Sequence, residues 1–209
     1  MKLKKESIGY VVVFTFIACA AFVVILAVAN QATIGQVEAN RSYASHYTVL
    51  KAFGLADPTT SPAEVESKYA SLVKELPEPS PGVSAYSATI DGTPFIGVKI
   101  TNAGLWGPIT AILAADPRAE RVRGFEVLDQ QETPGLGGRI SEPWFTAQFA
   151  GEKVGADGKI AVTQGSGKGD PDKENSNVDA VTGASRTSDF VRGLVANALA
   201  TIKRIGGNI

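Results

Sequence analysis

Residues 83–100, VSAYSATIDGTPFIGVKI, place two segments rich in alternating apolar residues on either side of the pair Asp91-Gly92. Alternation of this kind is typical of strands that bury one face. The Asp-Gly pair tolerates the positive φ angles of a two-residue hairpin turn. The stretch therefore predicts an antiparallel β-hairpin, from which the rest of the fold can be worked out in both directions.

Further strands and helices follow the hairpin toward the C-terminus. We expect strands at 108–115 (PITAILAA), 121–130 (RVRGFEVLDQ) and 159–165 (KIAVTQG), a short helix at 142–149, and a final helix from about 187 to 205. This order predicts an α+β domain with a twisted, mostly antiparallel sheet flanked by helices, which we expect to pack against one side of the sheet.

Toward the N-terminus, residues 9–29 (GYVVVFTFIACAAFVVILAVA) contain no charge. About 20 apolar residues are enough for a helix to cross the hydrocarbon core of a bilayer, so this segment predicts one transmembrane helix. Lys2, Lys4 and Lys5 precede it, and no similar basic cluster follows closely. The positive-inside rule then predicts a cytoplasmic N-terminus and a C-terminal domain on the periplasmic or extracytoplasmic side of the cytoplasmic (inner) membrane.

A cleaved signal peptide is the alternative, because Ala27–Ala29 have the small-x-small pattern of a cleavage site. The apolar run is longer than the usual signal-peptide core of about 7–15 residues, so we expect a retained anchor. The helix should continue out of the membrane and end at Gly54, and a second helix should follow, capped by Ser61 and ending at Pro77. The predicted organisation is a cytoplasmic N-terminus and anchor (1–30), a helical connecting region (31–81) and a cofactor-binding domain (82–209).

Composition excludes several classes of protein. The 209 residues carry a formal net charge of −1 and no long basic block, which argues against nucleic-acid binding. The chain has one cysteine and one histidine, so it cannot build a disulfide framework, a zinc site or its own iron–sulfur cluster. No Ser-His-Asp set is evident, and we predict neither catalytic residues nor a metal site. Any redox chemistry would need an organic cofactor or partner subunits.

Two loops carry candidate binding chemistry. Residues 179–185 (DAVTGAS) precede the last helix, whose unpaired N–H groups could hold a phosphate. The alternative is an ordinary helix cap. Residues 129–140 (DQQETPGLGGRI) form a glycine-rich loop that could present its backbone to a flat ligand with polar edges, or could be a plain connection. It is not a dinucleotide fingerprint, because its glycine spacing differs and no βαβ unit surrounds it.

The single span, the ETPGLG motif at 132–137 and the Asp-x-x-Thr-Gly-Ala-Ser motif at 179–185 together resemble the FMN-binding subunits of Rnf and Nqr membrane complexes. These are the G subunit of Rnf and the C subunit of Nqr, and the similarity covers nearly the whole chain in element order. In that family a dedicated flavin transferase joins FMN through its phosphate to the last hydroxyl of the motif. That residue is normally threonine, and here it is Ser185.

The resemblance also implies roles for other residues. Asp179 would be part of what the transferase recognises, and Thr187 is a nearby hydroxyl outside the motif. The remaining cofactor-binding residues that it implies are Thr182, Gly183 and Ala184 around the phosphate, Glu132, Thr133, Leu136 and Gly137 along the isoalloxazine, and Leu105 and Trp106 in a segment near the flavin.

The function that follows from the resemblance is electron transfer through covalent FMN in an ion-translocating oxidoreductase complex, with Na⁺ or H⁺ as the ion. The chain would have no substrate site of its own, and its partners would be the other membrane subunits. Two alternatives are a flavin-free anchored scaffold and an extracytoplasmic flavin carrier for another reductase. The sequence does not decide between the Rnf and Nqr types.

Overall fold

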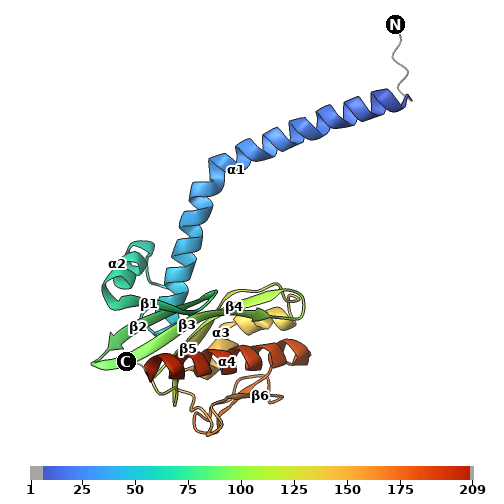
Figure 1. The fold of residues 1–209 in the computed structure, drawn as a ribbon. Coiled ribbons are helices and arrows are strands. Elements are labelled where there is room, and N and C mark those ends of the chain that lie inside the picture. Colours follow the sequence, from blue (N-terminus) through green and yellow to red (C-terminus); the bar gives the residue numbers. More distant parts are fainter. Residues whose placement is uncertain (1–6, 208–209) are drawn as a thin grey trace. The chain divides into compact units, whose positions relative to one another are not determined.

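The computed structural model describes residues 7–207 (Figure 1). The chain divides into two compact units, Met1–Ser42 and Tyr43–Ile209. Among the described residues, the first unit consists of the greater part of one helix. The second contains a sheet, the helices that cover it and the two loops singled out above.

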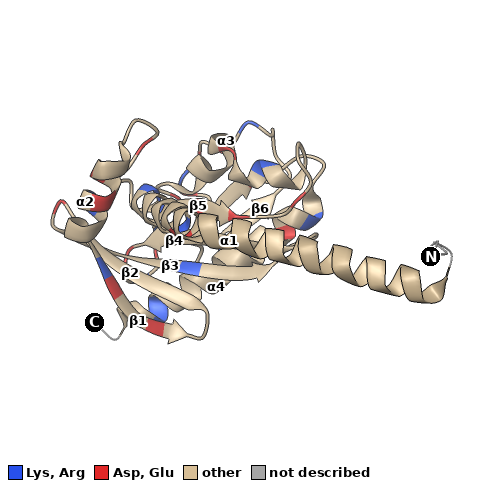
Figure 2. Ribbon diagram, turned by 90° about the horizontal axis from the view of Figure 1, so that it is seen from above, with Lys and Arg blue, Asp and Glu red and all other residues tan. Residues whose placement is uncertain are grey.

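Helix α1 (Ile8–Ala52) begins with a long uncharged segment. No Lys, Arg, Asp or Glu occurs between residues 8 and 37, and Figure 2 shows this part of the helix without charged residues. Within residues 7–207 it is the one helix that is long and apolar enough to cross a membrane. Gly54 follows its end with a φ of 71°, as the sequence predicts for a helix terminus. The three lysines used for orientation lie outside the described residues.

Five antiparallel strands form a meander in the order β1-β2-β3-β4-β5. Their bounds are Val73–Ser80, Val83–Ile90, Thr93–Ala103, Pro108–Ala115 and Val122–Asp129. The predicted hairpin is confirmed: Ile90 pairs with Thr93, and Asp91 and Gly92 have φ angles of 50° and 76°. The strands expected at 108–115 and 121–130 are confirmed as β4 and β5.

The second predicted helix is correct at its start and wrong at its end. Helix α2 (Pro62–Leu72) has the expected capping box, in which Ser61 and Glu64 exchange hydrogen bonds. It stops at Leu72 instead of Pro77, and the following residues form strand β1. Prolines are tolerated there because β1 is an edge strand, whose pairing with β2 becomes irregular between Leu76 and Ser80. The sheet therefore begins before the boundary that we placed at residue 82.

Helices cover both faces of the sheet, whereas the sequence placed them on one side. Helix α4 (Ser185–Gly206) packs on β3 and β4, where Leu194 lies in the larger core cluster with Val98 and Phe125. The end of α1 covers the opposite face, where Phe53 packs with Ile112. Figure 1 shows α4 and the end of α1 on opposite sides of the strands.

The segment between β5 and α4 contains short elements. They are η1 (Gly137–Ser141), α3 (Pro143–Thr146), η2 (Ala147–Phe149), β6 (Ala161–Thr163) and β7 (Asn177–Asp179). The helix expected at 142–149 appears as α3 followed by η2, and the strand expected at 159–165 is reduced to β6. Strand β7 was not predicted. It pairs with β6 in parallel and leads the chain toward the start of α4.

Phe53 requires a glycine on the sheet beneath it. A Cβ atom added to Gly97 would lie 2.8 Å from Cζ of this buried ring. We expect Gly97→Ala to lower the free energy of unfolding by about 1–3 kcal/mol through overpacking. Gly193→Ala is the control, because a Cβ at this α4 position meets nothing within 4 Å. That change should raise stability by about 0.5–1 kcal/mol. Urea denaturation of both variants checks the prediction, and equal effects would contradict it.

The carboxylate of Glu152 is fully buried behind η2. Its Oε1 accepts a hydrogen bond from the backbone N–H of Asn177 (3.2 Å), while Oε2 has no partner among the described residues. Burial raises the pKa of this carboxyl group above its ordinary value, because desolvation penalises the charged form.

This shift makes stability depend on pH. Since the folded pKa of Glu152 lies above the unfolded one, its stabilising contribution is present in acid and is lost as pH rises through the folded pKa. Glu152→Gln removes this titration. The unfolding free energy of the native chain minus that of the variant should therefore fall between about pH 4 and pH 8. Denaturant curves over that range measure the difference, and a difference that stays constant or rises would refute the assignment.

Candidate functional site

The side chain of Glu132 connects three segments that are far apart in sequence. Its Oε1 accepts hydrogen bonds from the backbone N–H groups of Leu105 (2.8 Å) and Trp106 (3.1 Å). Its Oε2 accepts one from the hydroxyl of Thr187 (2.6 Å). Glu132 is buried, so these bonds replace the water that the carboxylate loses. The loop after β3, the loop after β5 and the first turn of α4 are thereby held together.

Two glycines allow this close approach. A Cβ atom at Gly104 would lie 2.6 Å from Oε1 of Glu132, and one at Gly137 would lie 2.5 Å from Oγ1 of Thr187. Both distances are too short for a side chain. The glycines of the two loops therefore have a packing role that spacing alone did not reveal.

The three segments enclose a cleft of about 410 Å³. Nine of the eleven cofactor-binding residues expected from the resemblance line it, and only Thr182 and Asp179 do not. The lining residues are Leu105, Trp106, Glu132, Thr133, Leu136, Gly137, Gly183, Ala184, Ser185, Arg186 and Thr187. Arg186 was not proposed from the sequence, and Thr187 was proposed only as a second hydroxyl.

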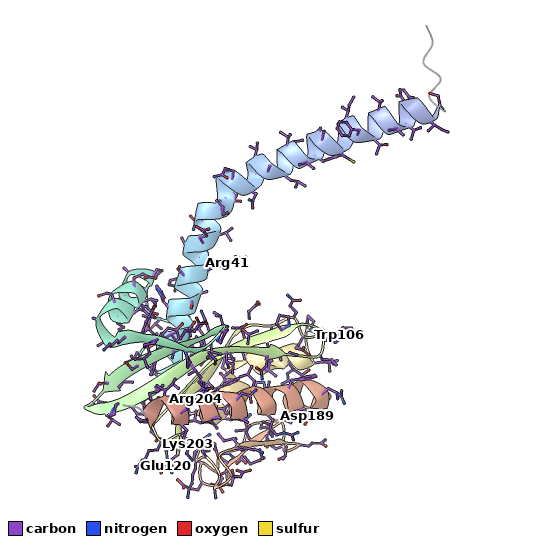
Figure 3. All side chains as sticks on the ribbon, viewed as in Figure 1. Arg41, Trp106, Glu120, Asp189, Lys203 and Arg204 are labelled. Atoms are coloured by element: carbon purple, nitrogen blue, oxygen red, sulfur yellow. The ribbon has the colours of Figure 1, made fainter. Side chains whose placement is uncertain are left out.

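Large apolar side chains line the cleft and remain exposed to solvent. Trp106 is 71% exposed, and Leu105 and Leu136 are also exposed. Figure 3 shows Trp106 extending from the end of the sheet. Exposed apolar side chains that converge on one concave surface are typical of ligand sites. The cleft therefore offers an apolar surface for a planar ring.

The first turn of α4 provides the polar part of the cleft. The helix begins at Ser185, two residues earlier than expected, so Ser185 is its first helical residue. The N-cap residue Ala184 gives no side-chain hydrogen bond, and the first turn contains no acidic residue. Unpaired backbone N–H groups and the positive end of the helix dipole favour an anion at such a terminus. Gly183 precedes the turn with a φ of 79°, a conformation that favours glycine.

The hydroxyl groups near this turn differ in access. Ser185 and Thr182 are exposed, whereas Thr187 is 1% exposed and donates its hydroxyl proton to Glu132. Thr187 therefore does not offer its oxygen to an approaching ligand or enzyme. Among the lining residues, Ser185 combines an exposed hydroxyl with a position at the helix terminus.

Asp179 lies at the end of β7 and is buried. Its Oδ2 accepts hydrogen bonds from the hydroxyl of Ser166 (2.9 Å) and the backbone N–H of Gly167 (3.1 Å). Its backbone N–H also donates to the side chain of Gln148 (2.7 Å). The structure thus buries the first residue of the motif, where it orders the neighbouring loop at Ser166 and Gly167, and recognition by a transferase stays a prediction for this residue.

The cleft holds few titratable groups. Glu132 and Arg186 are the ionisable residues among those that line it. His46 belongs to α1, where its Nδ1 contacts Glu66 (2.9 Å) and its ring stacks on Tyr69. The described residues contain no group of three or more His, Cys, Asp or Glu side chains placed to hold a metal ion. The geometry favours binding and positioning of a ligand over acid–base catalysis.

Comparisons with known proteins agree with this geometry. The profile of the family described as FMN-binding domain matches residues 104–200, which contain every proposed site residue. The chain is similar to the C subunit of the Na(+)-translocating NADH-quinone reductase of Neisseria meningitidis, with 42% identity over 94 residues. That match covers 44% of this chain and only 36%, about a third, of the relative.

Two longer matches extend the similarity over most of the chain. The C subunit of the same enzyme from Pasteurella multocida is 27% identical over 90% of this chain and 88% of its own length. The crystal structure of the corresponding protein from Parabacteroides distasonis has a TM-score of 0.63 at 26% identity, covering 80% of this chain and 94% of that one. The antiparallel sheet domain flanked by helices is thus shared with a solved structure.

The bond between Thr187 and Glu132 can be tested with an isosteric change. Thr187→Val removes the hydroxyl donor and leaves Oε2 of a buried carboxylate without its partner. We expect a loss of about 1–3 kcal/mol in the free energy of unfolding. Thr182→Val is the matched control, because Thr182 is exposed and should tolerate the change within about 0.5 kcal/mol. Urea denaturation measures both variants. If Thr187→Val is as stable as the control, the hydrogen bond between Thr187 and Glu132 does not stabilise the folded chain.

Proposed function

We propose that this chain is an FMN-binding subunit of the Rnf and Nqr type, which carries FMN covalently on Ser185 and transfers electrons within such a complex. The match of residues 104–200 to the FMN-binding domain family and the similarity to Nqr C subunits support this proposal. The observation that carries the proposal is the position of Ser185. The exposed Ser185 stands at the uncapped start of α4, inside a cleft that also contains residues of the ETPGLG loop and the exposed Trp106.

The residues present fit FMN. A phosphate at Ser185 would meet the unpaired N–H groups and positive dipole end of α4. The exposed side chains of Leu105, Trp106 and Leu136 offer an apolar surface for the isoalloxazine. The cleft volume of about 410 Å³ falls in the range of about 300–1,000 Å³ that is usual for ligand sites.

When bound, FMN supplies the capacity to accept and donate electrons, and the chain supplies position and electrostatics. During maturation the hydroxyl oxygen of Ser185 would form the new bond to the flavin-bearing phosphorus of a flavin nucleotide phosphoanhydride. The anhydride P–O bond would break, the nucleotide phosphate would leave, and the hydroxyl proton would pass to solvent, so a phosphodiester with one negative charge remains. Glu132 would hold the loops of the site in place and would not contact the cofactor chemically, because both of its oxygens already accept hydrogen bonds from Leu105, Trp106 and Thr187. Thr133 and Leu136 would then face the cofactor from a loop whose shape is fixed.

A covalent link suits the proposed location. We place the sheet domain on the extracytoplasmic side of the membrane, anchored by α1. Flavin there would be scarce, and a reversibly bound cofactor would be lost by mass action. The ester prevents this loss, and the anchor keeps the carrier at high effective concentration beside its partners. No separate substrate site is required for this role.

The partners that we propose are the membrane subunits of an ion-translocating oxidoreductase, with a flavin transferase acting during maturation. The relatives named above are subunits of a Na(+)-translocating NADH-quinone reductase, which favours the Nqr type for this chain. Helix α1, long and apolar enough to cross a membrane, is consistent with assembly among such subunits.

Attachment can be tested in the full chain produced together with a flavin transferase. Denaturing electrophoresis under ultraviolet light should show a fluorescent band that disappears in Ser185→Ala. Ser185→Thr should keep the band because it retains a hydroxyl, and Thr187→Ser should keep it because Thr187 is buried against Glu132. A band that persists in Ser185→Ala would refute this attachment residue. An intact mass equal to that of the unmodified chain would favour a flavin-free scaffold.

A further inference from the structure

Arg186 is the one cationic residue among those that line the cleft. It is the second residue of α4 and is exposed. None of the ion pairs or hydrogen bonds found within residues 7–207 involves its side chain. The acidic residue one turn further on, Asp189, pairs instead with Arg192 (3.0 Å). Figure 3 shows Asp189 near the start of this helix.

This position is unfavourable for a cation in an isolated chain. The first turn of α4 contains no acidic residue and receives no side-chain cap, so the positive end of the helix dipole is not compensated. A guanidinium group there adds like charge to that end. Residues that break a local rule without a visible compensation tend to mark functional sites. An anion bound at the turn would supply the missing compensation.

We propose that the guanidinium of Arg186 binds the phosphate of the flavin ester on Ser185 and restrains it against the start of α4. The inference rests on the proposed function, because it requires the cofactor to be attached at Ser185. A phosphodiester keeps two non-bridging oxygens and one negative charge. Guanidinium binds such oxygens through paired N–H donors, and backbone N–H groups of the first turn can share the same anion.

Arg186 then acts as a positioning residue with opposite effects in the two states of the protein. In the flavin-free chain it destabilises α4 by adding positive charge to the dipole end. In the loaded chain it stabilises the same turn by pairing with the phosphate. The sign of its contribution therefore depends on whether Ser185 carries flavin, which a residue with a purely structural role would not show.

A double-mutant cycle tests this dependence on the full chain in detergent, after production with the transferase. Arg186→Gln should lower the melting temperature of the flavin-loaded protein. In the Ser185→Ala background, which carries no ester, the same substitution should leave the melting temperature unchanged or raise it. Arg118→Gln is the charge-matched control, because Arg118 is exposed in the turn after β4 and pairs with Glu120 (3.4 Å). Arg118→Gln should shift the melting temperature by the same amount in the flavin-loaded protein and in the Ser185→Ala background.

The mobility of the flavin gives a second readout. Time-resolved fluorescence anisotropy should decay faster in loaded Arg186→Gln than in the native chain, and Arg186→Lys should restore part of the slow decay because it keeps the charge. Intact mass establishes how much of each sample is loaded. Additive melting shifts and unchanged anisotropy in samples that carry flavin would overturn the role of Arg186 while leaving the proposed function standing. A native chain without added mass would defeat both.

Discussion

The cleft depends on one buried carboxylate. Glu132 accepts hydrogen bonds from two backbone N–H groups of the loop after β3 and from one hydroxyl group in the first turn of α4. A carboxylate removed from water is costly unless such donors surround it, so the three segments hold one another in place. The arrangement also requires that no side chain stand at Gly104 or Gly137, where a Cβ atom would collide with the network. The loop after β3 and the loop after β5 are thus held in one hydrogen-bond network, which joins Glu132 to Leu105, Trp106 and Thr187.

The sheet brings these segments to one end. In an antiparallel meander the turn between β3 and β4 and the C-terminal end of β5 lie at the same end of the strands, as the pairs Ala103–Pro108 and Thr110–Asp129 show. Helix α4 lies across β3 and β4. Its first turn reaches the same end of the strands, where Thr187 contacts Glu132. Because both faces of the sheet are covered, the strands that carry the loops are held rigidly. A site at the ends of packed elements is more precisely placed than one on free loops.

Local patterns predicted the parts of the fold that local forces determine. The hairpin at Asp91-Gly92 and the capping box at Ser61 follow from short-range chemistry, and both are confirmed. The pattern failed at β1, whose prolines resemble a helix end and are tolerated only because the strand is at an edge. It also failed at the three-residue β7, which exists through pairing with β6. The bond between Glu132 and Thr187 spans 55 positions, so spacing within either motif could not reveal it.

The open form of the cleft is consistent with a tethered cofactor. A ligand held only by noncovalent contacts needs extensive burial to offset the freedom that it loses on binding. Here Trp106 is 71% exposed, and the cleft is bounded by loops and the first turn of one helix. If Ser185 supplies the attachment, affinity no longer has to come from burial, and one edge of the flavin can face a partner. The same exposure that would weaken a reversible site then favours electron exchange. The hydrogen bonds to Glu132 keep the remaining contacts of the cleft in a fixed geometry.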